Sequence, residues 1–120
     1  MHEMSVAESM LDVISEALGG RVEILSATIR LGPLAGIDPA SLQFCFTEVA
    51  EQLGFGTPGL IVNQVPAKAR CTECSRTYDL FRPYERCPDC HSMARQVSGG
   101  DDFEIDTVDV AEATHDDTER

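Results

Sequence analysis

The sequence predicts an α+β fold in which two helices pack on a small three-stranded mixed sheet, with a ribbon-like insert. Three observations predict it: two segments have apolar residues at helical spacing, three read as strands, and four of the five cysteines lie in one stretch before the last strand. Two helices that cover one face of a sheet bury both apolar stripes in the simplest way. A chain of 120 residues suits one domain with a small insert.

The first helix is predicted over residues 6–18. Ser5 and Glu8 form an S-x-x-E capping box, in which the two side chains satisfy backbone N–H groups at a helix start. Apolar residues recur at three- and four-residue steps through the segment and give one buried stripe. Gly19-Gly20 then ends the helix, because glycine readily adopts the left-handed conformation of a C-terminal cap.

The first strand is predicted at residues 25–31, where apolar and polar residues alternate. Gly32-Pro33 ends this strand. The residues expected on its buried face are Leu25, Ala27, Ile29 and Leu31.

The second helix is predicted to begin after Asp38, an N-cap that is followed by Pro39 at the first helical position, and to end at Gly54. We interpret Cys45, on the buried stripe, as an inert core thiol. The predicted stripe is Leu42, Cys45, Phe46, Val49, Ala50 and Leu53.

Residues 60–65 and 103–110 are the second and third predicted strands. Thr107-Val108 breaks the alternation of the last one, which indicates a β-bulge. The expected organisation is a first part of the α/β domain at 1–65, the insert at 66–98, the returning strand at 99–110 and an acidic, disordered tail at 111–120.

The formal net charge of -12 argues against a general polyanion binder, because phosphate backbones are bound by Lys and Arg. The charge is uneven: residues 1–65 and 99–120 are acidic, whereas residues 66–98 hold six basic and four acidic side chains. No apolar run approaches the roughly 20 residues that span a bilayer, and no secretory signal opens the chain. We therefore expect a cytoplasmic protein without a membrane partner.

The strongest chemical signal is CTECSRTYDLFRPYERCPDC, in which Cys71 and Cys74 form one C-x2-C pair, and Cys87 and Cys90 another. Two such pairs can hold structural zinc in a closed tetrahedral site, so the insert is predicted to be zinc-ribbon-like. Two disulfides are disfavoured in a reducing compartment. An iron-sulfur cluster or a single iron remains compatible with the spacing. His91 is either a replacement ligand or a solvated loop residue.

The chain opens with Met1, His2 and Glu3. The terminal amine, the following amide nitrogen and the imidazole can close two fused chelate rings, which place three nitrogen donors in one plane. Such planar sites suit Ni(II) and Cu(II). Glu3 could add a carboxylate oxygen, and Asp38 another if the fold brings it close. The alternative interpretation of His2 is an ordinary exposed histidine.

Four features occur together in one order: MHEMSVAES, RLGPLAGIDPASLQFCFTEVAE, the two cysteine pairs and GGDDFEIDTVDV. Over nearly the whole chain except the tail, they resemble the HypA/HybF family of hydrogenase nickel-incorporation proteins. The resemblance implies a nickel metallochaperone, not an enzyme, with a small α/β nickel domain interrupted by a zinc domain.

The resemblance also implies site residues and partners. Met1, His2 and Glu3 match the family's nickel motif, and Asp38 is carried only as an accessory ligand. Cys71, Cys74, Cys87 and Cys90 match its zinc ligands. The implied partners are the GTPase HypB and the large-subunit precursor of [NiFe]-hydrogenase, with urease maturation proteins as further recipients. An insert between two strands would also permit domain exchange and thus a homodimer.

Two other classes of function compete with the chaperone. A zinc-ribbon interaction or nucleic-acid-binding module is the leading alternative, but four thiolates with one Zn(II) would cancel the insert's excess of two positive charges. A hydrolase has less support, because the sequence holds neither a nucleophile motif nor H-E-x-x-H.

Overall fold

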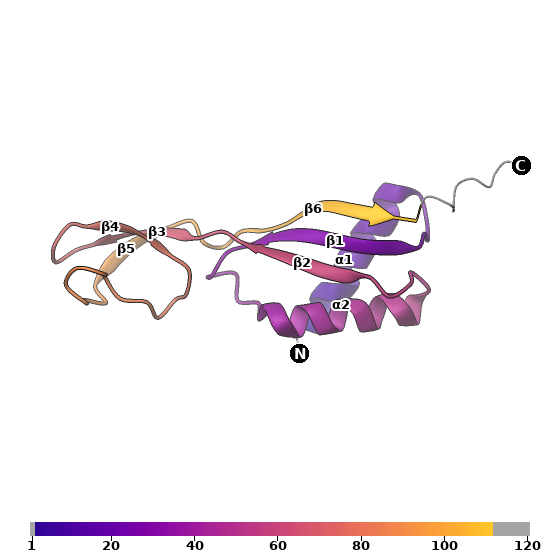
Figure 1. Ribbon diagram of the computed structural model, residues 1–120, viewed down its shortest axis with the longest axis horizontal. Helices are drawn as coiled ribbons and strands as arrows, with labels where there is room; N and C mark the ends of the chain where they lie inside the picture. Colours follow the sequence, from indigo (N-terminus) through magenta and orange to yellow (C-terminus); the bar gives the residue numbers. More distant parts are fainter. Residues whose placement is uncertain (1, 112–120) are drawn as a thin grey trace, which may run out of the picture. The chain divides into compact units, whose positions relative to one another are not determined.

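The computed structural model describes residues 2–111 (Figure 1). The predicted nickel ligand Met1 and residues 112–120, which include His115 and nearly all of the predicted tail, lie outside the described residues. The elements follow the order α1 (His2–Leu18), β1 (Ile24–Leu31), α2 (Pro39–Leu53), β2 (Gly59–Gln64), β3 (Ala67–Cys71), β4 (Thr77–Leu80), β5 (Arg95–Ser98) and β6 (Phe103–Val110).

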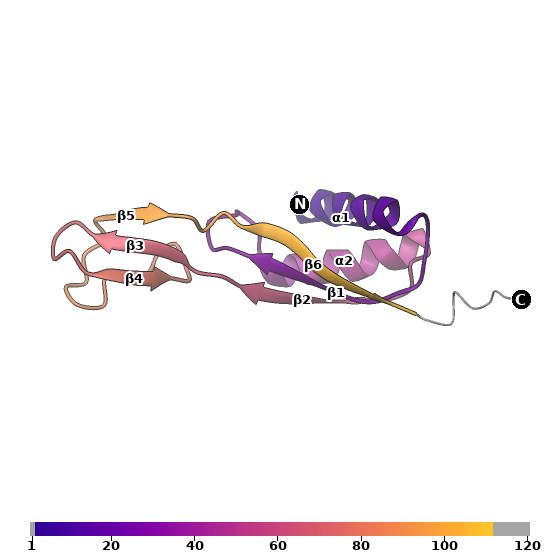
Figure 2. The same cartoon turned by 90° about the horizontal axis from the view of Figure 1, so that it is seen from above.

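The strands β2, β1 and β6 form one three-stranded sheet in that order. The arrows in Figure 2 show that β1 and β2 run parallel and that β6 runs antiparallel to them. α2 supplies the crossover that parallel neighbours require. Both helices lie on the same face of this sheet and contact each other (Figures 1 and 2). The predicted α+β fold, with two helices on a mixed three-stranded sheet, is confirmed.

The main core lies between the two helices and the sheet. Each helix buries one stripe, as the three- and four-residue spacing predicted. The buried helical residues are Ala7, Met10, Leu11 and Ile14 in α1, and Leu42, Phe46, Val49 and Ala50 in α2. None of the helices among the described residues is long and apolar enough to cross a membrane.

The start of α1 differs from the prediction. The helix begins at His2, so Ser5 lies inside it and the predicted capping box with Glu8 is wrong. Instead, the carboxylate of Glu3 in the first turn accepts a hydrogen bond from the backbone N–H of Asp38, with 3.0 Å between the two atoms. This tertiary contact ties the first turn of α1 to the residue before α2, and a carboxylate in a first turn is also favoured by the helix dipole.

The limits of α2 are confirmed. Asp38 has an extended backbone and accepts a hydrogen bond from Ser41 N–H at 2.9 Å, and Pro39 follows it. Gly54 ends the helix in the left-handed conformation, at φ 88°. The buried stripe is narrower than predicted, since Cys45 is half-buried and Leu53 is 45% exposed.

One predicted core position of the first strand is wrong. Leu25 is 54% exposed, whereas Ile24, just before the predicted strand, is buried. The strict alternation holds only from Ala27 to Leu31, because the burial pattern breaks between Ile24 and Ala27. In β6, burial also loses its alternation, at Asp106-Thr107, near the predicted bulge.

The strands β4, β3 and β5 form a second sheet, which is antiparallel throughout. The sequence predicted a ribbon-like insert here without bounds for its strands, and the structure places β3, β4 and β5 in it. The alternation of apolar and basic residues along Ala67–Cys71 was a usable sequence signal for β3. A small apolar cluster of Ala67, Ala69 and Leu80, with Tyr78 against it, lies under this sheet.

The described residues divide into two compact units. The first unit consists of the described parts of Met1–Ile29, Asp38–Val62 and Ile105–Arg120, and the second of Arg30–Ile37 and Asn63–Glu104. The second unit thus contains the cysteine insert together with two short flanking segments.

A close backbone crossing joins those flanking segments within the second unit. Gly32 N–H donates to the Asp102 carbonyl at 2.9 Å, and Leu34 N–H donates to the Gly100 carbonyl at 2.6 Å. A Cβ atom at Gly32 would lie 2.3 Å from the Gly100 carbonyl oxygen. The crossing therefore requires glycine at position 32 for steric reasons alone.

Candidate functional site

The two cysteine pairs lie in two turns of the same construction. In the first turn, Ser75 N–H donates to the Cys71 carbonyl at 3.0 Å. In the second turn, His91 N–H donates to the Cys87 carbonyl at 2.9 Å. Ser75 and His91 have positive φ angles, 69° and 65°, which let the chain reverse directly after the second cysteine of each pair.

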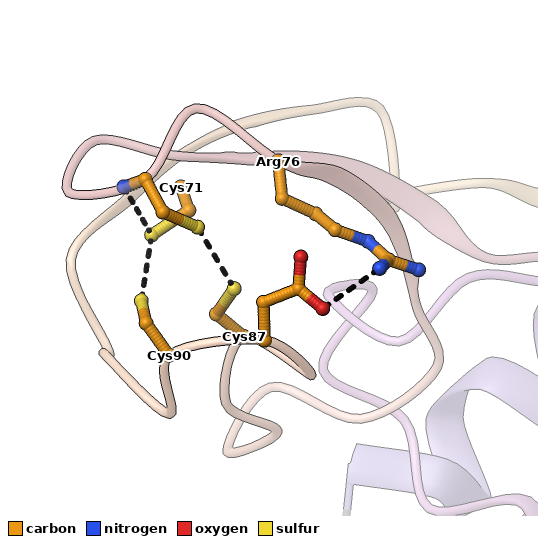
Figure 3. A network of polar contacts seen from close by, with 6 residues as sticks. Cys71, Arg76, Cys87 and Cys90 are labelled. Carbon is orange, nitrogen blue, oxygen red and sulfur yellow. Dashed lines mark hydrogen bonds and ion pairs between the residues drawn. The ribbon is translucent and has the colours of Figure 1, made fainter.

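All four sulfur atoms converge (Figure 3). They lie within 4.8 Å of one another, with 3.5 Å between the sulfurs of Cys71 and Cys90 and 3.6 Å between those of Cys74 and Cys87. Four thiolates bound at about 2.3 Å around a tetrahedral Zn(II) would be about 3.8 Å apart, so the donor set fits this ion. The four cysteines are free, and the sulfur separations far exceed the disulfide bond length of about 2.05 Å.

Backbone N–H groups favour ionisation of the first cysteine in each turn. The N–H groups of Cys74 and Glu73 point at the Cys71 sulfur, at 3.4 and 3.3 Å, and lower the pKa of that thiol. In the second turn, the N–H groups of Cys90 and then Asp89 help to lower the pKa of Cys87 to about 7. Each turn therefore presents one thiol that ionises readily.

The second cysteine of each turn resists ionisation. The Ser92 N–H favours the thiolate of Cys90, but the Cys71 thiol, burial and the other two thiols outweigh it and raise the pKa of Cys90 to about 12. The pKa of Cys74 is also raised, because burial and the Cys87 and Cys71 thiols outweigh its bond from the Arg76 N–H. A divalent cation would offset this crowding of negative charge and favour four thiolates.

At the start of α1, the Glu3 carboxylate lies between His2 and Asp38, the other predicted nickel ligands among the described residues. Its Oε2 atom lies 3.6 Å from His2 Nε2 and 3.0 Å from the backbone nitrogen of Asp38. The His2 side chain is 55% exposed, whereas that of Glu3 is only 14% exposed. The start of α1 thus lies close to the loop before α2, and the contact is made through the backbone of Asp38.

Both carboxylates in this region are held in the ionised form. The pKa of Glu3 is lowered, mainly by the hydrogen bond from the Asp38 backbone. The pKa of Asp38 is lowered by its bonds from the side chain and then the backbone of Ser41. The region therefore offers negative oxygen atoms near an exposed imidazole, but the described side chains of His2, Glu3 and Asp38 do not form a group close enough to share one metal ion.

His91 lies outside the sulfur cluster. Within residues 2–111, the four cysteines are the one group of three or more His, Cys, Asp or Glu side chains close enough to share a metal ion. His91 is therefore not part of that group.

The Glu3–Asp38 bond was not predicted from the sequence, because no local pattern connects residues 35 positions apart.

The fold and the four-cysteine cluster define a small α+β protein of the metal-binding class. The chain belongs to the HypA family, described as hydrogenase/urease nickel incorporation metallochaperones, since the family model matches residues 1–110. The resemblance found in the sequence is thereby confirmed, and the family is one of metallochaperones and hydrogenase maturation factors.

Several curated relatives cover almost the same length. The chain is 32% identical over 114 residues to hydrogenase maturation factor HypA of Chlorobium luteolum, with 93% of this chain and 97% of the relative covered. It is 33% identical over 112 residues to HypA of Azotobacter chroococcum, with 92% and 99% covered.

A solved structure shares the fold. The solution structure of the Ni metallochaperone HypA from Helicobacter pylori superimposes with a TM-score of 0.56. The match covers 90% of this chain and 96% of that one, at 19% sequence identity. At this identity the likeness supports the arrangement of helices and strands.

Proposed function

We propose that the chain binds Ni(II) at its N-terminus and delivers it for maturation of [NiFe]-hydrogenase. Membership of the nickel-incorporation family supports the cargo. The observation that supports the site most directly is the 3.0 Å hydrogen bond from Asp38 N–H to the Glu3 carboxylate. This bond holds the first turn of α1, which contains the exposed His2, against the loop before α2. The ion would therefore bind beside two carboxylates.

The proposed nickel ligands are Met1, His2 and Glu3, with Asp38 as an accessory. The Met1 amine, the His2 amide nitrogen and the His2 imidazole would supply three nitrogen donors in one plane. Asp38 is accessory because one of its carboxylate oxygens already accepts the Ser41 N–H and caps α2. An exposed site at a chain end suits a cargo ion, since a recipient can replace the ligands one at a time.

The proposed structural ion is Zn(II), bound by Cys71, Cys74, Cys87 and Cys90. The sulfur separations of 3.5 Å for Cys71–Cys90 and 3.6 Å for Cys74–Cys87 are near those of a tetrahedral zinc site. Four protein ligands leave no open position for substrate, so the ion would hold the second unit folded and would not catalyse a reaction. On this basis the protein is proposed not to be an enzyme.

The proposed setting is the cytoplasm, with HypB and the hydrogenase large-subunit precursor as partners and urease maturation as a further destination. The relatives named as hydrogenase maturation factors support this setting. A nucleic-acid or membrane partner is not part of the proposal, because the chain has a net charge of -12.

Nickel titration of a histidine variant tests the proposal. We expect His2→Ala to abolish or strongly weaken Ni(II) binding in isothermal titration calorimetry of untagged, zinc-loaded protein. His91→Ala is the matched control, because His91 is also exposed but lies outside the proposed nickel site, and it should keep the wild-type affinity. Unchanged stoichiometry and affinity in His2→Ala would refute the site.

A further inference from the structure

The two cysteine turns are separate local structures that must be brought together. Twelve residues separate Cys74 from Cys87 along the chain. Each turn is closed by its own backbone bonds, such as Cys71 N–H to the Arg76 carbonyl at 2.8 Å and Cys87 N–H to the Ser92 carbonyl at 3.0 Å. Those bonds shape each turn, but they do not hold one turn against the other.

Backbone bonds join the turns on the side of Cys71. Cys71 pairs with Arg95 in the β3–β5 ladder, and Thr72 N–H donates to the Ala94 carbonyl at 3.1 Å. These contacts hold the β3 end of the first turn to the segment that follows the second turn. They do not involve Pro88 or Asp89, which lie between Cys87 and Cys90.

A side-chain ion pair joins the turns through residues next to the other sulfur pair. Arg76 Nη1 lies 2.9 Å from Asp89 Oδ1, and Figure 3 shows the Arg76 guanidinium reaching across to a carboxylate beside the sulfur cluster. Arg76 follows Cys74 by two residues, and Asp89 follows Cys87 by two residues. The bond between the turns thus runs beside the Cys74–Cys87 pair, whose sulfurs are 3.6 Å apart.

We propose that the Arg76–Asp89 ion pair is a clasp that holds the two turns together and slows the loss of metal from the four-thiol centre. The inference rests on the proposed zinc site and adds two residues that position it without touching the ion. Loss of the metal requires its bonds to thiolates of both turns to break, and these bonds break more readily when the two turns can move apart. The clasp opposes that separation beside the Cys74–Cys87 pair, where the backbone bonds on the Cys71 side do not reach.

The expected size of the effect follows from the exposure of the pair. The side chains of Arg76 and Asp89 are 46% and 55% exposed, so water and salt screen their attraction. Breaking the pair should therefore speed metal release by about two- to five-fold, as expected of an exposed ion pair. The acceleration should shrink at high salt, where the wild-type pair is already weakened.

Zinc transfer from the full-length, zinc-loaded chain to the chromophoric chelator 4-(2-pyridylazo)resorcinol tests the clasp. Arg76→Gln and Asp89→Asn remove one charge each and keep the backbone N–H groups beside the sulfurs. Each should accelerate transfer, and the double variant should be no faster than either single variant. Arg76→Lys, and the exchange of Arg76→Asp with Asp89→Arg, should restore slow transfer in part.

The matched control is Lys68→Gln. Lys68 in β3 forms an ion pair with Asp79 in β4, in the same unit as the clasp, but neither residue lies next to a cysteine. This variant should release zinc at the wild-type rate. Equal rates in Arg76→Gln, Lys68→Gln and wild type, with one zinc bound per chain, would overturn the clasp and leave the proposed zinc site intact. A wild-type chain that binds no zinc would overturn both.

Discussion

Glu3 shows how one side chain near the chain start connects distant parts of the sequence. It was predicted as a metal ligand, and the structure uses its carboxylate to accept the Asp38 N–H. The cap of α2 at Asp38 was predictable, because its partner Ser41 is three residues away and N-caps have a local pattern. The bond from Asp38 to Glu3 was not predictable, since it depends on how α1 packs against α2.

We expect the stability contribution of Glu3 to depend on pH. Its pKa is lowered from 4.5 in the folded chain, mainly by the Asp38 N–H, so the ionised group stabilises the fold above pH 4.5. This contribution is lost as the pH falls through the lower folded pKa. Glu3→Gln should therefore reduce the thermal midpoint at neutral pH, and the difference from wild type should vanish in acid.

Glu8→Gln provides the control for that measurement, because Glu8 is exposed on the same helix. It should leave the midpoint unchanged at both pH values. A difference between Glu3→Gln and wild type that persists undiminished in acid would show that the Glu3 charge is not responsible.

At the scale of elements, the local signals of α2 were predicted correctly, whereas the local capping box of α1 and the features that depend on packing were not. α2 is bounded by Asp38 and Gly54, as its local signals indicated. β5 has only four residues, which leave little periodicity to detect, whereas the alternation along the five residues of β3 was present but not recognised. The exposure of Leu25 also could not be predicted, because only the packed structure shows where the alternation in β1 begins.

The backbone crossing at Gly32 gives a prediction at this scale. In Gly32→Ala, the added Cβ would lie 2.3 Å from the Gly100 carbonyl oxygen and 2.5 Å from its carbon, so the crossing backbone must shift. We expect the free energy of unfolding of the zinc-loaded protein to fall by about 2 kcal/mol or more in a urea titration.

Gly59→Ala is the matched control, because an added Cβ there would have no atom within 4 Å and no positive φ is required. It should change the free energy of unfolding by less than about 0.5 kcal/mol. Equal stability of the two variants would show that the segments around Gly32 and Gly100 do not cross as described.

At the scale of the whole molecule, the order of motifs predicted the fold class and the family, both of which are confirmed. The predicted domain boundaries stay predictions. In the structure, residues 30–37 and 99–104 group with the cysteine insert. The backbone hydrogen bonds between Gly32 and Asp102 and between Leu34 and Gly100 explain this grouping. No sequence pattern predicts such bonds.

The two units should respond differently to removal of zinc. The cluster under the second sheet consists of Ala67, Ala69 and Leu80 with Tyr78, which is too little apolar surface to hold the sheet without metal. After chelation, amide signals of β3, β4 and β5 should collapse in a two-dimensional NMR spectrum, whereas those of α1 and α2 should persist. Dispersed signals from β3 in metal-free protein would contradict this account, and added zinc should reverse the collapse.

The central claim is that the free amine of Met1 and the neighbouring imidazole of His2 bind Ni(II) together. Calorimetric titration of Ni(II) into untagged protein and into protein with one glycine added before Met1 tests this claim most directly, because every side chain is retained. We expect one nickel per chain in the untagged protein, loss of this binding in the extended protein, and bound zinc in both. Equal nickel affinity in the two proteins would contradict it.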